Sequence, residues 1–173
     1  WKVGSGDITW PAIIEAMARH HKPVLIATGA ADMSDVRRAV AAARKHEDRI
    51  VVMQCNTNYT GSLENFRHVA LNVLKTYARE FPDIVLGLSD HTPGCATVLG
   101  AVALGARVVE KHFTDDRGRE GPDHAFSMDP SNWREMVVRN GAATAAICTG
   151  TNTLSLHDAL PVGVVRRAVR AKR

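Results

Sequence analysis

Short apolar segments recur along the chain at intervals that fit a repeating strand–helix unit. Each segment is almost continuously apolar, which is typical of parallel strands that are covered on both faces. The segments begin roughly 25–30 residues apart, the length of one βαβ unit. The predicted strands are Lys2–Gly4, Pro23–Thr28, Ile50–Gln54, Ile84–Ser89 and Ala106–His112.

The stretches between these segments carry apolar residues at helical spacing. In one of them Val36 and Val40 share a face, and Ser34 is a candidate N-cap just before it. Asp129 followed by Pro130 also indicates the start of a helix. The predicted helices are Pro11–His21, Asp35–His46, Leu63–Phe81 with Ser62 as N-cap, Thr97–Leu104 and Asn132–Val138.

Polar residues follow every predicted strand, and this distribution favours a barrel over an open sheet. In a (βα)8 barrel all strands deliver their last residues to one mouth, whereas in a doubly wound sheet only the strands beside the switch point do so. We therefore predict an α/β fold of the TIM-barrel type, represented by about the last five βα units. The polar groups are Ser5 and Asp7, Thr28, Asn56–Tyr59, Ser89–His91 and Glu110–His112.

Composition and charge are those of an ordinary globular domain. The 173 residues are 45% hydrophobic and 23% charged, and no apolar run approaches a membrane span. The net charge is +4, but residues 161–173 hold five basic residues and no acid, and subtracting these five charges leaves −1 for the rest. We expect neither a nucleic-acid nor a membrane partner. Three widely spaced cysteines favour a reducing, cytoplasmic location.

The pattern changes after about Asn140. Residues 1–140 form the predicted barrel portion, and residues 141–173 fit no βα unit. The run LSLHDALP in this tail resembles translated sequencing adapter, so we interpret 141–173 as an artefactual or disordered extension. The chain also begins with Trp1 and leads straight into a strand, which we interpret as a cut that removes the N-terminal part of the protein.

His91 and His112 form a candidate metal site. Residues two apart on a strand share a face, so His91 lies with Ser89, and His112 lies with Glu110 on the next strand. Neighbouring parallel strands are about 4.8 Å apart, which lets both imidazoles reach one ion. Two nitrogen ligands completed by oxygens suit Mn²⁺ better than structural zinc. Two separate hydrogen-bonded histidines remain the alternative.

Two further clusters suggest substrate contacts. The segment KVGSGD places Lys2, Ser5 and glycine amides at one strand end, where an anion such as phosphate or carboxylate can bind. Asp123, in a charged loop, can bind sugar hydroxyls, and Tyr59 can contact substrate, although a solvated turn and a rim aromatic are the alternatives. We interpret Asp90 as a residue that orients a neighbouring loop rather than a substrate contact.

Six motifs in this order and spacing resemble the N-acetylneuraminate (sialic acid) synthase family, from Trp1 to about Val138. The combination of GLSDH, EKHFT about twenty residues later, and then GPDH is highly specific. The motifs are KVGSGD, KPVLIATGA, QCNTNYTGSLENF, GLSDHTPG, AVALGARVVEKHFTDD and GPDHAFSMDP.

The resemblance implies a site and a reaction. His91 and His112 would be the metal ligands, with Mn²⁺ the expected ion and Mg²⁺ or Co²⁺ as alternatives. The substrates would be phosphoenolpyruvate and an N-acyl amino sugar of the N-acylmannosamine type, condensed by this transferase with release of phosphate. The full-length protein would be a homodimer. The other implied roles are phosphoenolpyruvate binding by Lys2, Ser5 and Ser89, catalysis by Asp7 and Asp123, sugar binding by Asp123 and Tyr59, and a compensating contact from Thr28.

The motifs also depart from the family pattern. Ala27 stands where many members have serine, which is why Thr28 is expected to compensate, and QCNTNYT suggests a subfamily with a different sugar. Five strands of an eight-stranded barrel leave two open edges, so we expect the isolated chain to be marginally stable and inactive. Another metal-dependent aldolase-type barrel, and an inactive fragment with a basic polyanion-binding tail, are the alternatives.

Overall fold

The computed structural model describes residues 1–140 and 145–149. This part of the chain contains one six-stranded sheet in the order β1-β2-β3-β4-β5-β6, and every neighbouring pair is parallel. The strands are Lys2–Val3 (β1), Val24–Ala27 (β2), Ile50–Cys55 (β3), Val85–Asp90 (β4), Val108–His112 (β5) and Ala145–Thr149 (β6).

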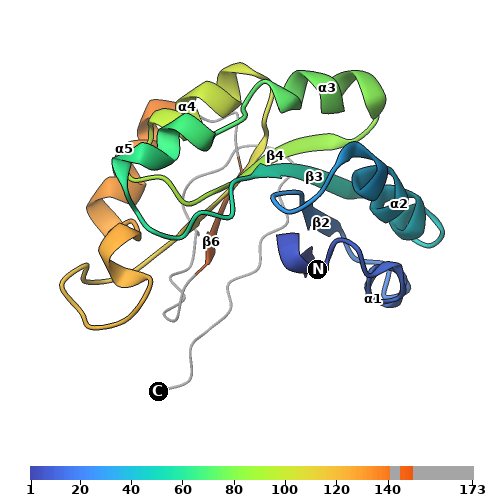
Figure 1. Ribbon diagram of the computed structural model, residues 1–173, viewed down its shortest axis with the longest axis horizontal. Coiled ribbons are helices and arrows are strands. Elements are labelled where there is room, and N and C mark those ends of the chain that lie inside the picture. The colour runs from blue at the N-terminus through green and yellow to red at the C-terminus, as the bar shows by residue number, and fades with distance from the viewer. Residues whose placement is uncertain (141–144, 150–173) are drawn as a thin grey trace.

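The order of the strands in the sheet is the same as their order in the chain. A doubly wound sheet reverses its order at a switch point, whereas a barrel adds each new strand on the same side as the last. Figure 1 shows the sheet curling, with helices along its convex side. The predicted α/β class and parallel sheet are confirmed, and the described residues form an open, partial barrel rather than a closed one.

Helices and short 3-10 turns connect the strands. Pro11 stands at the first helical position of α1, where its missing N–H costs nothing because that group has no helical partner. Asp129 accepts a hydrogen bond from the backbone N–H of Asn132 and so caps α5, as predicted. The helices are α1 (Pro11–Ala18), α2 (Met33–Arg44), α3 (Val73–Glu80), α4 (Ala96–Ala103) and α5 (Pro130–Asn140), and the 3-10 turns are η1 (Ser5–Asp7), η2 (Leu63–His68) and η3 (His124–Phe126).

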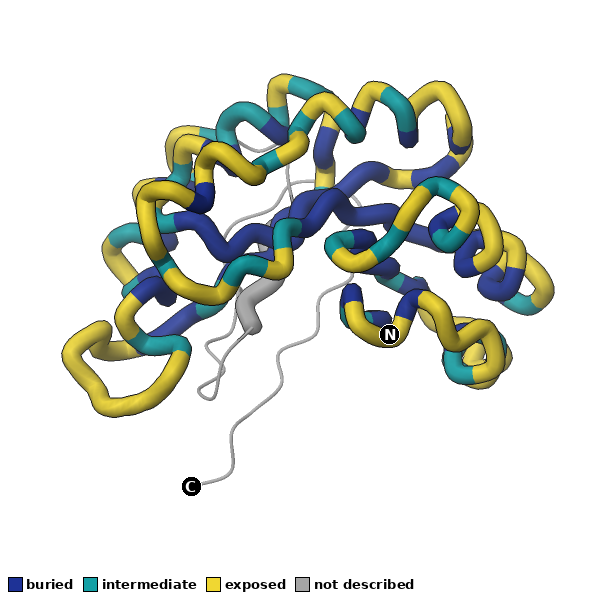
Figure 2. Tube along the Cα trace, viewed as in Figure 1, coloured by how far each residue is buried: buried dark blue, intermediate teal, exposed yellow. Residues whose placement is uncertain are grey.

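The core lies between the convex face of the sheet and the helices. Alternate strand residues such as Ile26, Val52 and Leu88 join one buried apolar cluster with helix residues such as Ile14 and Leu74. Figure 2 shows β2 to β5 mostly buried and the helices with many exposed residues. Because successive strand residues point to opposite faces, the residues between these core positions, such as Ala27 and Ser89, face the concave side.

Three local predictions differ from the structure. The single helix predicted over 63–81 is η2 followed by α3, because the buried amide of Asn65 bonds to the carbonyl of Asn58 and the hydroxyl of Thr60 instead of fitting a continuous helix. The N-cap of α2 is Asp32, whose carboxylate accepts from the N–H groups of Ser34 and Asp35. Strand β6 was not predicted, because its small residues show no clear pattern.

No helix in the described residues is long and apolar enough to cross a membrane. The predicted boundary at about residue 140 stays a prediction, and residues 141–144 and 150–173 of the predicted tail lie outside the described residues.

Candidate active site

A pocket of about 190 Å³ opens on the concave side of the sheet, where β1 to β5 end. Strand ends from both flanks of the sheet supply its walls, as the barrel hypothesis requires. The lining residues are Lys2, Gly4, Ser5, Ala27, Cys55, Tyr59, Ser89, Asp90, His91, Glu110, Lys111 and His112.

His91 and His112 lie side by side in this pocket, with ring centroids 5.1 Å apart. The Nδ1 of His91 lies 2.6 Å from the backbone carbonyl of Asn56. Because a carbonyl only accepts, His91 Nδ1 carries the proton and its Nε2 keeps a free lone pair. Burial lowers the pKa of both histidines below the ordinary range, and for His91 the neighbouring His112 lowers the pKa further. Both imidazoles are therefore neutral at neutral pH, which is the form that binds metals.

The donor set fits a metal ion held by two protein nitrogens. A carbonyl or carboxylate behind a histidine ring is the usual arrangement of metal-bound histidine, and here Asn56 stands behind His91 and the carboxylate of Asp123 lies 3.4 Å from Nδ1 of His112. No cluster of three or more His, Cys, Asp or Glu side chains that could hold an ion occurs among the described residues. Substrate and water oxygens would have to complete the coordination shell, which suits a hard six-coordinate ion.

Lys2 lines the same pocket as the histidines and pairs with Glu110. Its Nζ is 2.8 Å from one carboxylate oxygen of Glu110 and 3.1 Å from the other. The Glu110 side chain is almost fully buried, whereas that of Lys2 keeps about a third of its surface exposed. The Lys2 ammonium therefore faces the pocket with donor capacity left for a further anion.

Two hydroxyls accompany Lys2 at the strand ends. The Oγ of Ser5 accepts a hydrogen bond from the backbone N–H of Gly29 at 3.0 Å. A side chain at Gly29 would come within 2.7 Å of Thr57, so this close approach requires glycine. Burial raises the pKa of the Cys55 thiol, while hydrogen bonds with Ser5 and Ser89 act in the opposite direction. The cysteine therefore stays a neutral thiol between the two serines.

Aromatic side chains border the histidine end of the pocket. The ring of Tyr59 is 4.1 Å from that of His91 and 5.9 Å from that of His112, and half of the tyrosine remains exposed. The ring of Phe126 also packs on His112, with the ring centroids 5.2 Å apart. The structure thus brings the predicted sugar-binding residues Tyr59 and Asp123 to the two histidines.

Three predicted site residues do not line the pocket: Asp123, which reaches only His112 at its edge, Thr28 and Asp7. Thr28 is buried, and its hydroxyl donates to the carbonyl of Met53 and accepts from the hydroxyl of Tyr77, both at 2.9 Å. Strand alternation explains this, because Ala27 occupies the concave side and Thr28 therefore turns to the helices. Asp7 is exposed on η1, where its backbone N–H bonds to the carbonyl of Gly4 at the rim.

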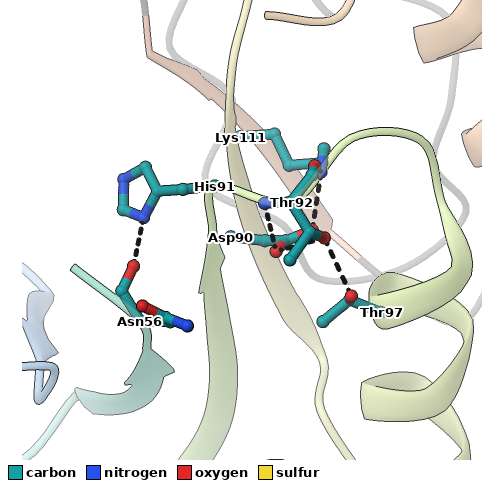
Figure 3. Close-up of polar contacts among 6 residues, drawn as sticks. All are labelled: Asn56, Asp90, His91, Thr92, Thr97 and Lys111. Atoms are coloured by element: carbon teal, nitrogen blue, oxygen red, sulfur yellow. Dashed lines mark hydrogen bonds and ion pairs between the residues drawn. The ribbon is translucent and has the colours of Figure 1, made fainter. Parts of the chain in front are cut away.

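A buried ion pair lies directly beside the histidines. The Nζ of Lys111 is 2.6 Å from the Asp90 carboxylate, and both side chains are only 2% exposed. The pair faces α4, where Thr92 bonds to Thr97. Figure 3 shows His91 pointing toward Asn56, away from Lys111.

Several members of the site were not predicted from the sequence. The signal for Glu110 was present, because it lies two residues before His112 and shares its strand face, but a single glutamate gave no reason to assign a role. The carbonyl of Asn56 carried no signal, since every residue has a carbonyl. The Asp90–Lys111 pairing depends on strand register, which residue types alone do not reveal.

Comparison with known proteins agrees with the resemblance to the sialic acid synthase family. A protein-family model described as the NeuB family matches residues 1–152. The chain is 36% identical to an uncharacterized protein of Methanocaldococcus jannaschii, over 100% of the chain and 50% of that protein. It is 34% identical to the N,N'-diacetyllegionaminic acid synthase of Legionella pneumophila over 99% of the chain and 49% of the relative. It is 34% identical to the human N-acetylneuraminate-9-phosphate synthase, over 79% of the chain and 37% of the relative. The chain thus spans about half the length, or less, of the curated relatives it matches.

Solved structures show the same likeness. The crystal structure of the spore coat polysaccharide biosynthesis protein SpsE of Bacillus subtilis matches 80% of this chain and 38% of its own, with a TM-score of 0.71 and 34% identity. The N-acetylneuraminic acid synthetase of Leptospira borgpetersenii, solved in complex with citrate, matches 80% of this chain and 47% of its own, with a TM-score of 0.74 and 28% identity.

Proposed function

This chain belongs to the NeuB family, and we propose on that basis that the protein containing it is a nonulosonic acid synthase. In this proposal a C–C bond-forming transferase condenses phosphoenolpyruvate with an N-acylmannosamine-type sugar and releases phosphate. The observation that carries the proposal is the pairing of two kinds of group in one pocket. A cation, two hydroxyls and two neutral imidazoles all line this one pocket.

The phosphoenolpyruvate end of the pocket is assigned to Lys2, Ser5 and Ser89. An ammonium group and two hydroxyls are suitable donors for a phosphate and a carboxylate. Glu110 holds the Lys2 ammonium at the wall, so that the arriving anion meets an already oriented donor. Thr28 is omitted from this set, because its hydroxyl is engaged with Tyr77 and Met53.

The metal end of the pocket is assigned to His91 and His112, with Mn²⁺ as the proposed ion and Mg²⁺ or Co²⁺ as alternatives. Such an ion supplies Lewis acidity toward the aldehyde oxygen of the open-chain sugar. His91 is oriented for this task by the carbonyl of Asn56, and His112 by the carboxylate of Asp123.

The proposed reaction joins the methylene carbon of phosphoenolpyruvate to the aldehyde carbon of the sugar. Water adds to the carbon that carries the phosphate ester, and phosphate leaves as the keto group forms. Lys2, Ser5 and Ser89 would hold the phosphate and carboxylate while charge redistributes around them. Asp123 is placed to bind a sugar hydroxyl beside His112, and Tyr59 to cover the sugar from the solvent side.

Relatives named as synthases of legionaminic, neuraminic and pseudaminic acids support an N-acylated amino sugar as the acceptor. A cytoplasmic homodimer is the proposed working form. The alternative of another aldolase-type barrel predicts a simple aldose phosphate as the acceptor instead.

The test is phosphate release by the full-length protein that carries this chain, with phosphoenolpyruvate, Mn²⁺ and a panel of acceptors. We expect turnover with N-acylmannosamines or their diacetylated relatives, and a nonulosonic acid as the product by mass spectrometry. His91→Ala and His112→Ala should each abolish turnover, and Lys45→Met on the outer surface is the matched control. Turnover with aldose phosphates alone would overturn the proposed function.

A further inference from the structure

The buried pair Asp90–Lys111 is tied to the backbone of Thr92, directly after His91. Asp90 directly precedes His91, and its Oδ1 accepts from the backbone N–H of Thr92 at 3.0 Å. Lys111 donates to the backbone carbonyl of Thr92 at 2.7 Å. Both backbone polar groups of Thr92, the residue after His91, are thus held by the ion pair, and the backbone cannot turn there without breaking a buried hydrogen bond.

The pair lies at the point where the sheet stops holding the two strands together. Asp90↔Lys111 is the last registered pair between β4 and β5, and β4 ends at Asp90. His91 lies one residue beyond that end, so no ladder position is registered for it, whereas His112 is the last residue of β5. The Asp90–Lys111 ion pair therefore links the side chains of β4 and β5 where their backbone ladder ends, beside the two histidines.

An ion pair is unusual at a buried position whose only role is packing. Both side chains are 2% exposed, and a buried ion pair contributes little stability compared with apolar side chains of the same volume. Thr92 and Thr97 add two hydroxyls to the same cluster. Such a fully bonded network permits one geometry, whereas an apolar pair would permit several.

We propose that Asp90 and Lys111 are positioning residues that hold the imidazoles of His91 and His112 at the separation needed to share one ion. This inference rests on the proposed function for its metal. The fixed arrangement of the two imidazole rings, in contrast, does not require any ion to be bound.

The test replaces the pair with apolar side chains of similar size, Asp90→Leu together with Lys111→Met. A milder variant, Asp90→Asn, keeps an oxygen for Thr92 but removes the charge that holds Lys111. Leu74→Ala, in the fully buried core of α3, is the control for loss of stability at a distance from the pocket. The variants are made in the full-length protein that carries this chain and compared at one pH.

Two measurements are made on each variant. Metal-free NMR records the nuclear Overhauser effect between the rings of His91 and His112 and the tautomer of His91. Electron spin resonance records the dissociation constant for Mn²⁺. We expect both charge-removing variants to lose the ring-to-ring effect and the single tautomer, and to bind Mn²⁺ roughly 10- to 100-fold more weakly. Leu74→Ala should match the unsubstituted chain in both.

The outcomes separate the inference from the proposed function. An unchanged ring-to-ring effect and Mn²⁺ affinity in the apolar double variant would overturn the positioning role. If that variant does not fold, Asp90→Asn decides by the same two measurements. If His91→Ala leaves Mn²⁺ affinity unchanged, the proposed metal site is wrong, and the metal-free ring geometry still judges the positioning role.

Discussion

The Nζ of Lys2 lies 2.8 Å from Oε2 of Glu110, although β1 and β5 are separated in the sheet by three other strands. In a flat sheet, strands four places apart would lie about 19 Å from each other, at about 4.8 Å per step. A lysine and a glutamate cannot bridge that distance. The ion pair therefore requires the sheet to curl, and it brings the outermost polar strand ends into one pocket, as a barrel wall does.

Replacing Lys2 by Met is expected to weaken phosphoenolpyruvate binding by roughly 10- to 100-fold, because a charge-assisted hydrogen bond is worth about 1.5–3 kcal/mol. The substitution also leaves the buried Glu110 carboxylate without its cation, which adds repulsion toward the anionic substrate. Isothermal titration calorimetry with phosphoenolpyruvate measures the effect.

Lys45→Met is the matched control for this prediction, because Lys45 also pairs with a glutamate but lies on the outer surface. Its phosphoenolpyruvate affinity should equal that of the unsubstituted protein. Equal affinities for Lys2→Met and Lys45→Met would remove Lys2 from the substrate site.

The sequence was informative where the type and spacing of residues determine the geometry. Apolar segments marked five of the six strands, and strand alternation placed His91 and His112 on the same face. The motif-based resemblance to sialic acid synthases is confirmed by the family match. The predictions that failed depended on tertiary contacts. Thr28 was assigned to the site on its position beside Ala27, but the strand turns it toward Tyr77.

Strand register and contacts to the backbone could not be predicted from the sequence either. The Asp90–Lys111 pair forms because these residues stand opposite each other in neighbouring strands, and 20 intervening residues give no hint of that register. The 3-10 turn η2 replaced a predicted helix because Asn65 finds partners in the preceding loop. The roles of Asp7, Ser89, Asp123 and the metal ligands stay predictions.

Ser89→Ala and Thr28→Val should distinguish the roles of two hydroxyls that were both predicted to contact substrate. Ser89 lines the pocket, so its loss is expected to weaken phosphoenolpyruvate binding several-fold with little change in stability. Thr28→Val removes a buried partner of Tyr77 and should cost about 1–2 kcal/mol of unfolding free energy, with affinity unchanged. Calorimetry and urea denaturation measure the two quantities, and the reverse result would return Thr28 to the substrate site.

Tyr59→Ala is expected to raise the KM for the sugar about 10-fold and to leave the KM for phosphoenolpyruvate unchanged. The reason is that half of this ring is exposed, at 4.1 Å from the ring of His91, on the side where the sugar is proposed to bind. Tyr59→Phe keeps the ring and should recover most of the sugar affinity. Steady-state kinetics with each substrate varied in turn measures both KM values. A change in the KM for phosphoenolpyruvate would indicate that Tyr59 acts in phosphoenolpyruvate binding instead.

A pH-dependent contribution to stability is expected at the opposite end of β3, from Glu47. Its carboxylate accepts hydrogen bonds from the Arg49 side chain at 2.7 and 2.8 Å and from the Arg49 backbone at 2.9 Å. These bonds, the side-chain bonds above all, lower the pKa of Glu47 to about 2. A carboxyl whose pKa is lower in the folded state stabilises the fold above its unfolded pKa of about 4.3, and the contribution is lost as the pH falls toward 2.

Glu47→Gln should therefore lower the unfolding free energy at pH 7 by about 1 kcal/mol, a value kept small because the Arg49 side chain is 63% exposed to solvent. The difference from the unsubstituted chain should shrink between pH 5 and pH 2, in urea denaturation curves followed by circular dichroism. Glu64→Gln, which breaks an exposed pair with Arg67, is the control and should show no such difference at any pH. A gap between Glu47→Gln and the unsubstituted chain that stays constant down to pH 2 would mean that the glutamate acts through packing and not through its charge.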